Sequence, residues 1–453
     1  MKLSVIGGGS TFISFFINGL DLIREELQVD ELVLMDIDEK RLSIVGNFAR
    51  RMAKKRNLNT KIELTLDPVN AIKNSDFVIT TIRPGGLKAR ATDERIALKY
   101  GLFPHETLGV VGLSYALRVV PPIVNYTRLV EKYAPDAWLI HFTNPASITA
   151  QASVKYVPNV KVFSVCDVPL ALAAGIAYML GAHGTVRELA RKVFLEYIGL
   201  NHAAWIRRIY FEGKDVTKQV LEKYKEFAEE IFGGDADIDA EAIKIFGMIP
   251  HPYLDYGFLA QKRYINYLSE RGKVRGEEAG EVVKKVLTAY SNPNVNDIPP
   301  VIFERGKYRN IQKEKEKEIP KWEVGSYEMA AFTIISAIYN KKNEIAYANI
   351  PSKGAIKGME DDMVFEMPVL ASHFGLAPLI HTSIPLSIRG FIHGLKASEI
   401  LIIEAAMEGS KEKVLQAVLA NPLFQTNDKL SMAIKVVDEL LKANREYLPQ
   451  FFK

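Results

Sequence analysis

A single cysteine followed directly by a carboxylate is the most unusual chemical feature of this 453-residue sequence. Cys166 and Asp167 stand in VFSVCDVP, just after an apolar run, and His202 stands in GLNHAAW after another such run. A lone cysteine usually packs as a small hydrophobic residue. A cysteine and a histidine that meet at one edge of a sheet could instead bind a divalent transition metal, with substrate oxygens completing its coordination. The residues alone leave both interpretations open.

A glycine run near the start of the chain is the second feature. Gly7-Gly8-Gly9-Ser10 lies between an apolar run and a predicted helix, where glycine lets backbone amides approach a pyrophosphate. Phe12 occupies the place of the usual third glycine. Asp36 ends the next apolar run, where a carboxylate can accept hydrogen bonds from ribose hydroxyls and repel the 2′-phosphate of NADP. These features predict an NAD site, and the alternative is an ordinary tight turn with a surface aspartate.

Two further polar segments follow predicted strands. Asn144 in HFTNPAS could bind a sugar hydroxyl or cap the following helix. The stretch IRPGGLKARATDER, which contains Arg83 and Arg90, is rich in arginine, glycine and acid. It is either part of a site or a solvated helix.

Short apolar runs alternate with helical stretches along the first 190 residues. This alternation predicts the α/β class, with a Rossmann-like, doubly wound parallel sheet whose ligands bind at the carboxyl ends of the strands. Helices are predicted over Thr11–Arg24 and Glu39–Lys55. The predicted strands are Lys2–Ile6, Glu31–Met35, Lys61–Leu66, Phe77–Thr81, Trp138–Phe142 and Lys161–Val165.

The chain is too long for one ordinary core, so we expect two lobes. Residues 1–190 would form the NAD-binding lobe, and residues 191–453 a mixed, mostly helical lobe for substrate, metal and oligomerisation. Lys313–Glu318 alternates lysine and glutamate, which is typical of a solvated surface. Strands are predicted over Val193–Leu200 and Ala204–Phe211, and helices over Val216–Phe232, Glu278–Ala289, Ser326–Tyr339, Ala397–Gly409 and Leu430–Ala443.

The composition fits a globular enzyme, with 48% hydrophobic and 25% charged residues. The 58 basic and 54 acidic residues nearly balance, and no long basic block occurs, so we expect no nucleic-acid partner. No apolar run has the length of a membrane span, so we expect no membrane association. One cysteine cannot form an internal disulfide, which fits a cytoplasmic location.

Taken together, the motifs resemble glycoside hydrolase family 4, the NAD- and metal-dependent glycosidases. The resemblance rests on GGGS, a strand ending in aspartate, RPGGLKAR, ET, FTNPA, CDVP, GLNH and PYLDY, and it runs along nearly the whole chain. It implies NAD and Mn²⁺, or another divalent metal, as cofactors, with Cys166 and His202 as metal ligands. NAD⁺ would oxidise the sugar at C3, a tyrosine would remove the C2 proton, the aglycone would be eliminated, water would add, and NADH would return the hydride to C3.

The resemblance also implies roles for single residues. Tyr253 is the expected base, with Tyr256 as the alternative, and Asp167 is the expected general acid. Asn144 would hold sugar hydroxyls and Arg90 would bind substrate. The residues expected to bind NAD are Gly7, Gly8, Gly9, Ser10, Thr11, Asp36 and Arg83.

The expected substrate is a 6-phosphorylated glucoside, and two signals conflict over its anomer. Asp167 is typical of family members that cleave 6-phospho-α-glucosides, whereas RPGGLKAR and PYLDY are closer to the β-type enzymes. The chain also departs from the family pattern in four places, two of which lie in PHET and in NIPSKGAI. His105 replaces the usual glutamine in PHET, and Asn349–Ile356 reads NIPSKGAI. We expect a homodimer or homotetramer.

Three alternatives remain at this point. One is a family-4 α-glucosidase or α-galactosidase that acts on non-phosphorylated sugars. Another is a malate/lactate-type NAD dehydrogenase, although GLNHAAW lacks the Gly-His-Gly setting of its catalytic histidine. The third is an NAD-dependent sensor without hydrolytic activity, which the presence of Cys166, His202 and Tyr253 disfavours.

Overall fold

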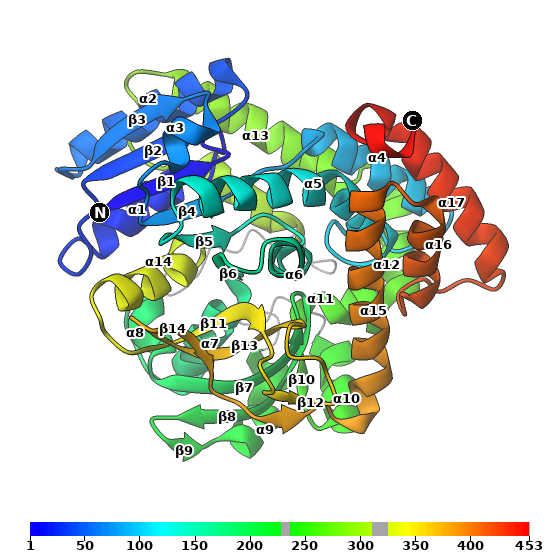
Figure 1. Ribbon diagram of the computed structural model, residues 1–453. Coiled ribbons are helices and arrows are strands. Elements are labelled where there is room, and N and C mark those ends of the chain that lie inside the picture. Colours follow the sequence, from blue (N-terminus) through cyan, green and yellow to red (C-terminus); the bar gives the residue numbers. More distant parts are fainter. Residues whose placement is uncertain (228–235, 310–324, 453) are drawn as a thin grey trace.

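The computed structural model describes residues 1–227, 236–309 and 325–452. Its N-terminal part contains six parallel strands in the order β3-β2-β1-β4-β5-β6 (Figure 1). This order reverses between β1 and β4, as in dinucleotide-binding sheets. All six strands were predicted from the sequence, and the Rossmann-like fold class is confirmed. The strands are β1 (Lys2–Ile6), β2 (Glu31–Met35), β3 (Lys61–Thr65), β4 (Phe77–Thr80), β5 (Trp138–His141) and β6 (Lys161–Ser164).

Alternating side chains of these strands enter two separate apolar clusters because neighbouring residues of a strand point to opposite faces. Val5 and Leu34 pack on one face of the sheet, with α1 and α2, whereas Ile6 and Val33 pack on the other, with α3, α5 and α6. Helices therefore cover both faces of the parallel sheet. The helices of this part are α1 (Ile13–Leu22), α2 (Glu39–Lys55), α3 (Pro68–Ile72), α4 (Gly86–Lys99), α5 (Gly109–Tyr133), α6 (Ala146–Tyr156), α7 (Val168–Met179) and α8 (Val186–Ala190).

The same sheet continues into the C-terminal part of the chain (Figure 1). Asn349 of β11 pairs with Ser164 of β6, and Glu366 of β13 pairs with Gly199 of β7, so the described residues form one 13-stranded sheet. The division at residue 190 therefore crosses a continuous sheet, and it stays a prediction. The added strands are β7 (Val193–Leu200), β8 (Ala203–Phe211), β9 (Lys214–Asp215), β10 (Ile249–Pro250), β11 (Glu344–Pro351), β13 (Val364–Ser372) and β14 (Gly375–Pro378); a separate pair consists of β12 (Ile356–Lys357) and β15 (Thr382–Ser383).

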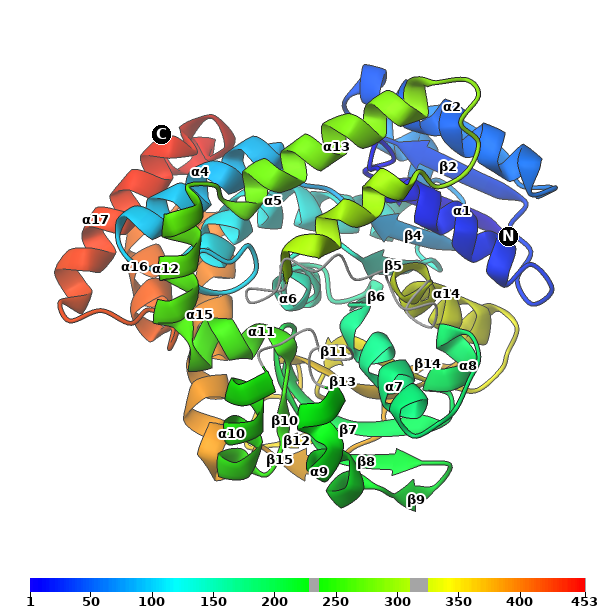
Figure 2. The same ribbon diagram turned by 180° about the vertical axis from the view of Figure 1, so that it is seen from behind.

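Helices dominate the remainder of the C-terminal part, where α17 lies beside α4 and α16 beside α5 of the N-terminal part (Figure 2). The predicted helix over 216–232 corresponds to α9 as far as residue 227, and its last five residues lie outside the described part, as does the alternating stretch 313–318. The helices are α9 (Thr217–Phe227), α10 (Ala236–Phe246), α11 (Pro252–Leu254), α12 (Gln261–Arg271), α13 (Arg275–Ser291), α14 (Ser326–Tyr339), α15 (Leu386–Glu408), α16 (Lys411–Ala420) and α17 (Lys429–Ala443).

Within the described ranges, none of the helices combines the length and the apolar character that crossing a membrane requires.

Candidate active site

Most of the predicted site residues lie at the carboxyl edge of the parallel sheet. The last residues of β1, β2 and β4 are in register, and so are those of β4, β5 and β6. The segments that follow these strands therefore begin side by side. They carry the glycine run after β1, Asp36 after β2, Arg83 after β4, Asn144 after β5 and Cys166 after β6.

The glycine turn after β1 is closed by contacts that leave no room for side chains. Gly7 has φ +102°, and a Cβ on it would lie 2.5 Å from the carbonyl oxygen of Thr81. A Cβ on Gly8 would lie 2.7 Å from Cβ of Leu34. The Gly9 amide donates a 2.8 Å hydrogen bond to Oδ2 of Asp36, so the predicted ribose-binding carboxylate is tied to the turn.

Ser10 and Thr11 lead from this turn into α1. The Ser10 amide donates to the Gly7 carbonyl at 3.0 Å, and the Thr11 carbonyl accepts from the hydroxyl of Tyr290 at 2.9 Å. Phe12, at the place of the missing third glycine, stacks on Tyr327 of α14 with ring centroids 4.7 Å apart. The position is thus used for packing between two helices.

Cys166 and His202, the two residues that the family resemblance suggested as metal ligands, lie next to each other. The Sγ atom of Cys166 lies 3.5 Å from Nε2 of His202. Two ligands about 2.3 Å (S) and about 2.1 Å (N) from a metal, at a tetrahedral angle, are about 3.6 Å apart, so the separation fits a shared divalent ion. Among the described residues no group of three or more His, Cys, Asp and Glu could hold a metal, which leaves the other coordination positions to water or substrate oxygens.

The surroundings of Cys166 favour a cation. Desolvation raises the pKa of its thiol well above the usual value, and the neighbouring carboxylates of Asp167 and Glu366 raise it further. Oδ1 of Asp167 lies 3.7 Å from Sγ. A bound divalent metal would offset this penalty, since metal coordination stabilises the thiolate.

His202 lies in a tight turn between β7 and β8, where Leu200 pairs with Ala203. Its backbone φ is +65°, an uncommon conformation for a residue other than glycine. Its Nδ1 lies 2.6 Å from Oγ1 of Thr107, and its Nε2 is directed at Cys166. The histidine is thus held from one side while its other ring nitrogen faces the cysteine.

Tyr253, the predicted base, lies beside the metal pair in α11. Its ring centroid is 4.5 Å from that of His202, with the two rings nearly perpendicular, and 4.9 Å from that of His105. Its amide donates to Nδ1 of His251 at 3.1 Å. Burial lowers the pKa of His105 well below its usual value, and neighbouring His202 lowers it further, so His105 is neutral. The side chain of Tyr256, the alternative base, lies outside the described residues.

Arg83 and Arg90 converge on one carboxylate that the sequence did not single out. Arg83 Nη1 lies 2.7 Å and Arg90 Nη1 2.9 Å from Oε2 of Glu106. Burial opposes ionisation of Glu106, yet the two guanidinium groups lower its pKa well below the usual value. Arg90 also donates from Nε to Glu94 at 2.7 Å. Arg90 and Glu94 are both buried, so the interpretation of this segment as a solvated helix is wrong.

A second buried carboxylate supports the turn that contains His202. Glu366 of β13 accepts hydrogen bonds from Nδ2 of Asn201 at 3.1 Å, Nδ2 of Asn349 at 3.0 Å and the hydroxyl of Tyr197 at 3.1 Å. Desolvation raises the pKa of Glu366 to about 7, so near neutrality it is partly protonated. Sequence analysis missed it because a buried glutamate and Pro368 obscure the apolar pattern of β13.

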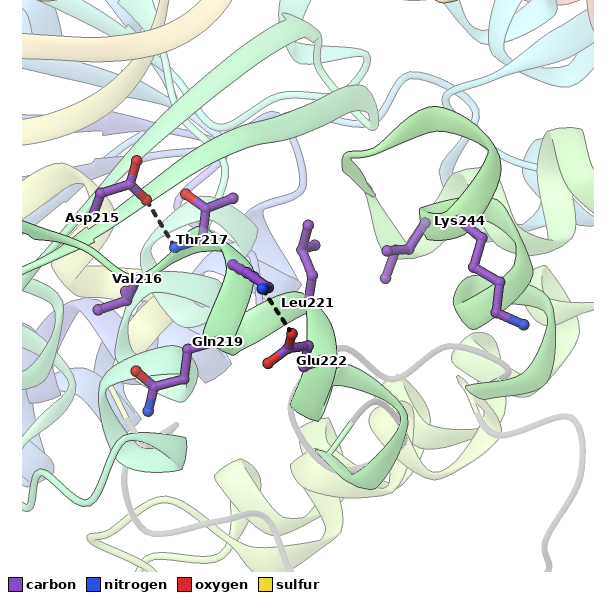
Figure 3. Close-up of a pocket in the computed structure, with 9 residues that line it drawn as sticks. Asp215, Val216, Thr217, Gln219, Leu221, Glu222 and Lys244 are labelled. Atoms are coloured by element: carbon purple, nitrogen blue, oxygen red, sulfur yellow. Dashed lines mark hydrogen bonds and ion pairs between the residues drawn. The ribbon is translucent and has the colours of Figure 1, made fainter.

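A hollow of about 810 Å³ lies elsewhere, between β9, α9 and α10 (Figure 3). Its walls include Asp215, Thr217, Glu222 and Lys244, and none of the predicted site residues. It is therefore separate from the Cys166–His202 pair.

Comparisons with known proteins agree with the geometry. The profile "Family 4 glycosyl hydrolase" matches residues 2–182, and "Family 4 glycosyl hydrolase C-terminal domain" matches residues 197–424. A probable 6-phospho-beta-glucosidase of Bacillus subtilis is 34% identical over 461 residues, covering 100% of this chain and 98% of that protein.

Two solved structures share the fold over nearly the full length. The 6-phospho-beta glucosidase from Thermotoga maritima, solved with manganese, NAD⁺ and glucose-6-phosphate, has a TM-score of 0.84 at 31% identity and covers 99% of both chains. A 6-phospho-alpha-glucosidase from gut microorganisms, in complex with NAD and glucose-6-phosphate, has a TM-score of 0.83 at 26% identity, covering 99% of this chain and 98% of that one. The two profile matches together span most of the sequence, and the chain belongs to family 4 of the glycosyl hydrolases.

Proposed function

We propose that this glycosidase hydrolyses 6-phosphorylated glucosides with the help of NAD and a divalent metal, for which Mn²⁺ is the first candidate. The observation that carries the proposal is the 3.5 Å approach of Cys166 to His202 beside Tyr253, at the sheet edge that also holds the glycine turn and Asp36. A dehydrogenase of the malate/lactate type needs no cysteine at this place. The family assignment likewise favours a glycosidase over that alternative and over a sensor.

Each site residue has a separate role in the proposed reaction. When bound, NAD would supply a hydride acceptor for C3 of the sugar and, as NADH, the hydride that restores C3 at the end of the reaction. The divalent metal would supply a Lewis acid for the sugar oxygens. Cys166 and His202 hold the metal. Tyr253 removes the C2 proton through its phenol oxygen, and Asp167 donates a proton to the departing glycosidic oxygen. Asn144 would orient the sugar hydroxyls.

Two observations support the phosphorylated substrate. The related structures from T. maritima and from gut microorganisms contain glucose-6-phosphate. In this chain Arg90, the residue expected to bind substrate, lies beside Arg83, and arginine is well suited to bind phosphate. Glu106 and Glu94 balance the charge of the two guanidinium groups, so a phosphate would compete with these carboxylates for Arg90.

The anomer is a choice between two candidates. The 34% identity to a probable 6-phospho-beta-glucosidase favours the β-glucoside, which we take as the leading candidate. Asp167, next to the metal ligand Cys166, favours the α-glucoside, as the family resemblance implies.

A panel of nitrophenyl glucosides tests the substrate. The α- and β-anomers, each with and without the 6-phosphate, are assayed with NAD⁺ and Mn²⁺, and again after chelation of the metal. We expect hydrolysis of a 6-phosphorylated anomer only, and its loss on chelation followed by recovery when Mn²⁺ is returned. Preference for the non-phosphorylated sugars would contradict the substrate proposal, and full activity in the chelator would contradict the metal.

The reaction type has its own test. Removal of the C2 proton predicts that hydrolysis in D₂O places deuterium at C2 of the released sugar, which mass spectrometry or NMR detects. Direct displacement at C1, as in glycosidases that use two carboxylates, would leave C2 without deuterium.

A further inference from the structure

We infer that Thr107 is a positioning residue for the metal site. Its hydroxyl oxygen accepts a hydrogen bond from Nδ1–H of His202, which leaves the lone pair on Nε2 of that histidine available to the metal. The inference rests on the proposed metal-binding role of Cys166 and His202. Thr107 follows Glu106 in the segment between α4 and α5, far in sequence from both ligands.

The hydrogen bonds around Thr107 favour one direction for its hydroxyl. The Thr107 amide donates to Nδ1 of His105 at 3.2 Å, so that nitrogen carries no hydrogen and acts as an acceptor. The Thr107 hydroxyl lies 3.0 Å from the same Nδ1 and 2.6 Å from Nδ1 of His202. A hydroxyl has one hydrogen to donate. If that hydrogen goes to His105, the hydroxyl oxygen accepts from His202.

This direction decides what His202 presents to Cys166. A neutral imidazole carries one hydrogen, so His202 with its hydrogen on Nδ1 has a lone pair on Nε2, the atom 3.5 Å from Sγ. The opposite direction would put a hydrogen on Nε2 and block coordination. Metal-bound histidines commonly donate their second ring nitrogen to a fixed acceptor, which sets the ring orientation and tautomer.

The fold holds the acceptor rigidly. Thr107 is 7% and His202 6% exposed, so water has little access to replace the hydroxyl. A Cβ added to Gly112 of α5 would lie 2.5 Å from the Thr107 carbonyl carbon, so the backbone of Thr107 packs closely against this helix. His105 stacks on Phe103 at 5.4 Å with nearly parallel rings, which fixes the far end of the hydrogen-bond chain.

The test measures metal affinity without relying on turnover. Metal-free protein with NAD⁺ bound is titrated with Mn²⁺, and free Mn²⁺ is followed by electron paramagnetic resonance. Thr107→Val keeps the shape of the side chain and removes the hydroxyl. We expect the dissociation constant of this variant for Mn²⁺ to rise by about 10- to 100-fold. Thr107→Ser restores the acceptor and should restore most of the affinity. Thr127→Val is the matched control, because Thr127 is buried in α5 and its hydroxyl donates to the Ile123 carbonyl, away from the site.

A second measurement needs no variant. In ¹⁵N-histidine-labelled wild-type protein loaded with Zn²⁺ as a diamagnetic probe, His202 should show a hydrogen on Nδ1 and metal on Nε2. The reverse arrangement would overturn the inference, as would unchanged Mn²⁺ affinity in Thr107→Val or equal losses in the valine and serine variants. Wild-type protein that binds neither metal would instead refute the metal site of the proposed function itself.

Discussion

At the scale of single residues, the site depends on groups whose charge state is set by their neighbours. Desolvation raises the pKa of the Cys166 thiol, so without a nearby cation the thiolate is disfavoured. Glu106 remains ionised because two guanidinium groups face its carboxylate and lower its pKa. The Tyr253 ring lies against the ring of His202, with the two ring centroids 4.5 Å apart.

Tyr253→Phe tests the proposed base. Loss of the phenol oxygen should slow turnover by about 10²- to 10⁴-fold and suppress deuterium incorporation at C2, because general bases contribute on that scale. Steady-state kinetics and product analysis in D₂O provide the two readouts. Tyr347→Phe is the control, since its buried hydroxyl accepts the Leu195 amide and has no proposed catalytic role. Exchange at the wild-type rate in Tyr253→Phe would assign the base to another residue, with Tyr256 the next to examine.

At the scale of elements, the β1–α1 turn and the end of β2 act as one unit. Asp36 accepts the Gly9 amide through Oδ2 and the Asp38 amide through Oδ1 at 3.1 Å, so its carboxylate both shapes the turn and is proposed to accept the ribose hydroxyls. Asp36→Ala should weaken binding of NAD⁺ more than that of NADP⁺, because it removes the acceptor and the charge that repels a 2′-phosphate. Calorimetric titration with both nucleotides measures the ratio.

Asp38→Ala is the comparison for that experiment. Asp38 caps α2 by accepting the Arg41 amide at 3.0 Å, so its loss should cost about 1 kcal/mol of stability without changing nucleotide preference. An unchanged ratio of NAD⁺ to NADP⁺ affinity in Asp36→Ala would show that Asp36 does not bind the ribose hydroxyls.

The packing of α14 against α1 contains a titratable group. Glu328 accepts a 2.6 Å hydrogen bond from Asn18 and is 1% exposed, and burial raises its pKa to about 7 from 4.5. Because the folded state holds this proton more tightly than the unfolded state, the stabilisation is complete below about pH 4.5 and is lost as pH rises through about 7.

Glu328→Gln should remove that dependence. Relative to the variant, wild-type protein should lose up to about 3 kcal/mol of stability between pH 4.5 and pH 8, from a shift of about 2.5 pKa units. Midpoints of urea unfolding across this range provide the measurement. Glu366 also has a raised pKa but is present in both proteins, so its contribution cancels. Parallel pH profiles for the two proteins would contradict the assignment.

At the scale of the whole molecule, buried polar contacts attach the C-terminal helices to the nucleotide-binding part. Arg118 of α5 donates to Asp93 of α4 at 2.7 Å and to Asn444, just after α17, at 2.8 Å. Both charged side chains are at most 1% exposed. Arg118→Leu should cost about 3–5 kcal/mol, since it leaves Asp93 buried without its charged partner.

Lys99→Ala is the matched control for Arg118. The Lys99–Glu439 pair also joins α4 to α17, at 2.7 Å, but Lys99 is 59% exposed, so its loss should cost under about 1 kcal/mol. Thermal unfolding of both variants measures the difference, and comparable shifts would contradict the proposed role of the buried pair.

The homodimer or homotetramer remains a proposal, for which light scattering coupled to size-exclusion chromatography gives the mass.

The sequence by itself determined the parallel sheet and its glycine turn, and it supplied the candidates for the residues that do chemistry. Strands β1 to β6 are short apolar runs bounded by breaks, and this local pattern is what a buried parallel strand requires. Cys166, His202 and Tyr253 became candidates because the motifs around them resemble those of the family, and their roles stay proposals.

Only the tertiary structure showed which groups surround these candidates. Thr107, Glu106 and Glu366 have ordinary residue types, and their roles arise from partners far along the chain: His202, two arginines, and Asn201 with Asn349. Hydrogen bonds of this kind follow from how the strands and loops are brought together in space, and no local periodicity encodes them. The continuation of the sheet through β11 and β13 escaped sequence analysis for the same reason, because those strands carry polar residues that become favourable only once they are paired inside the fold.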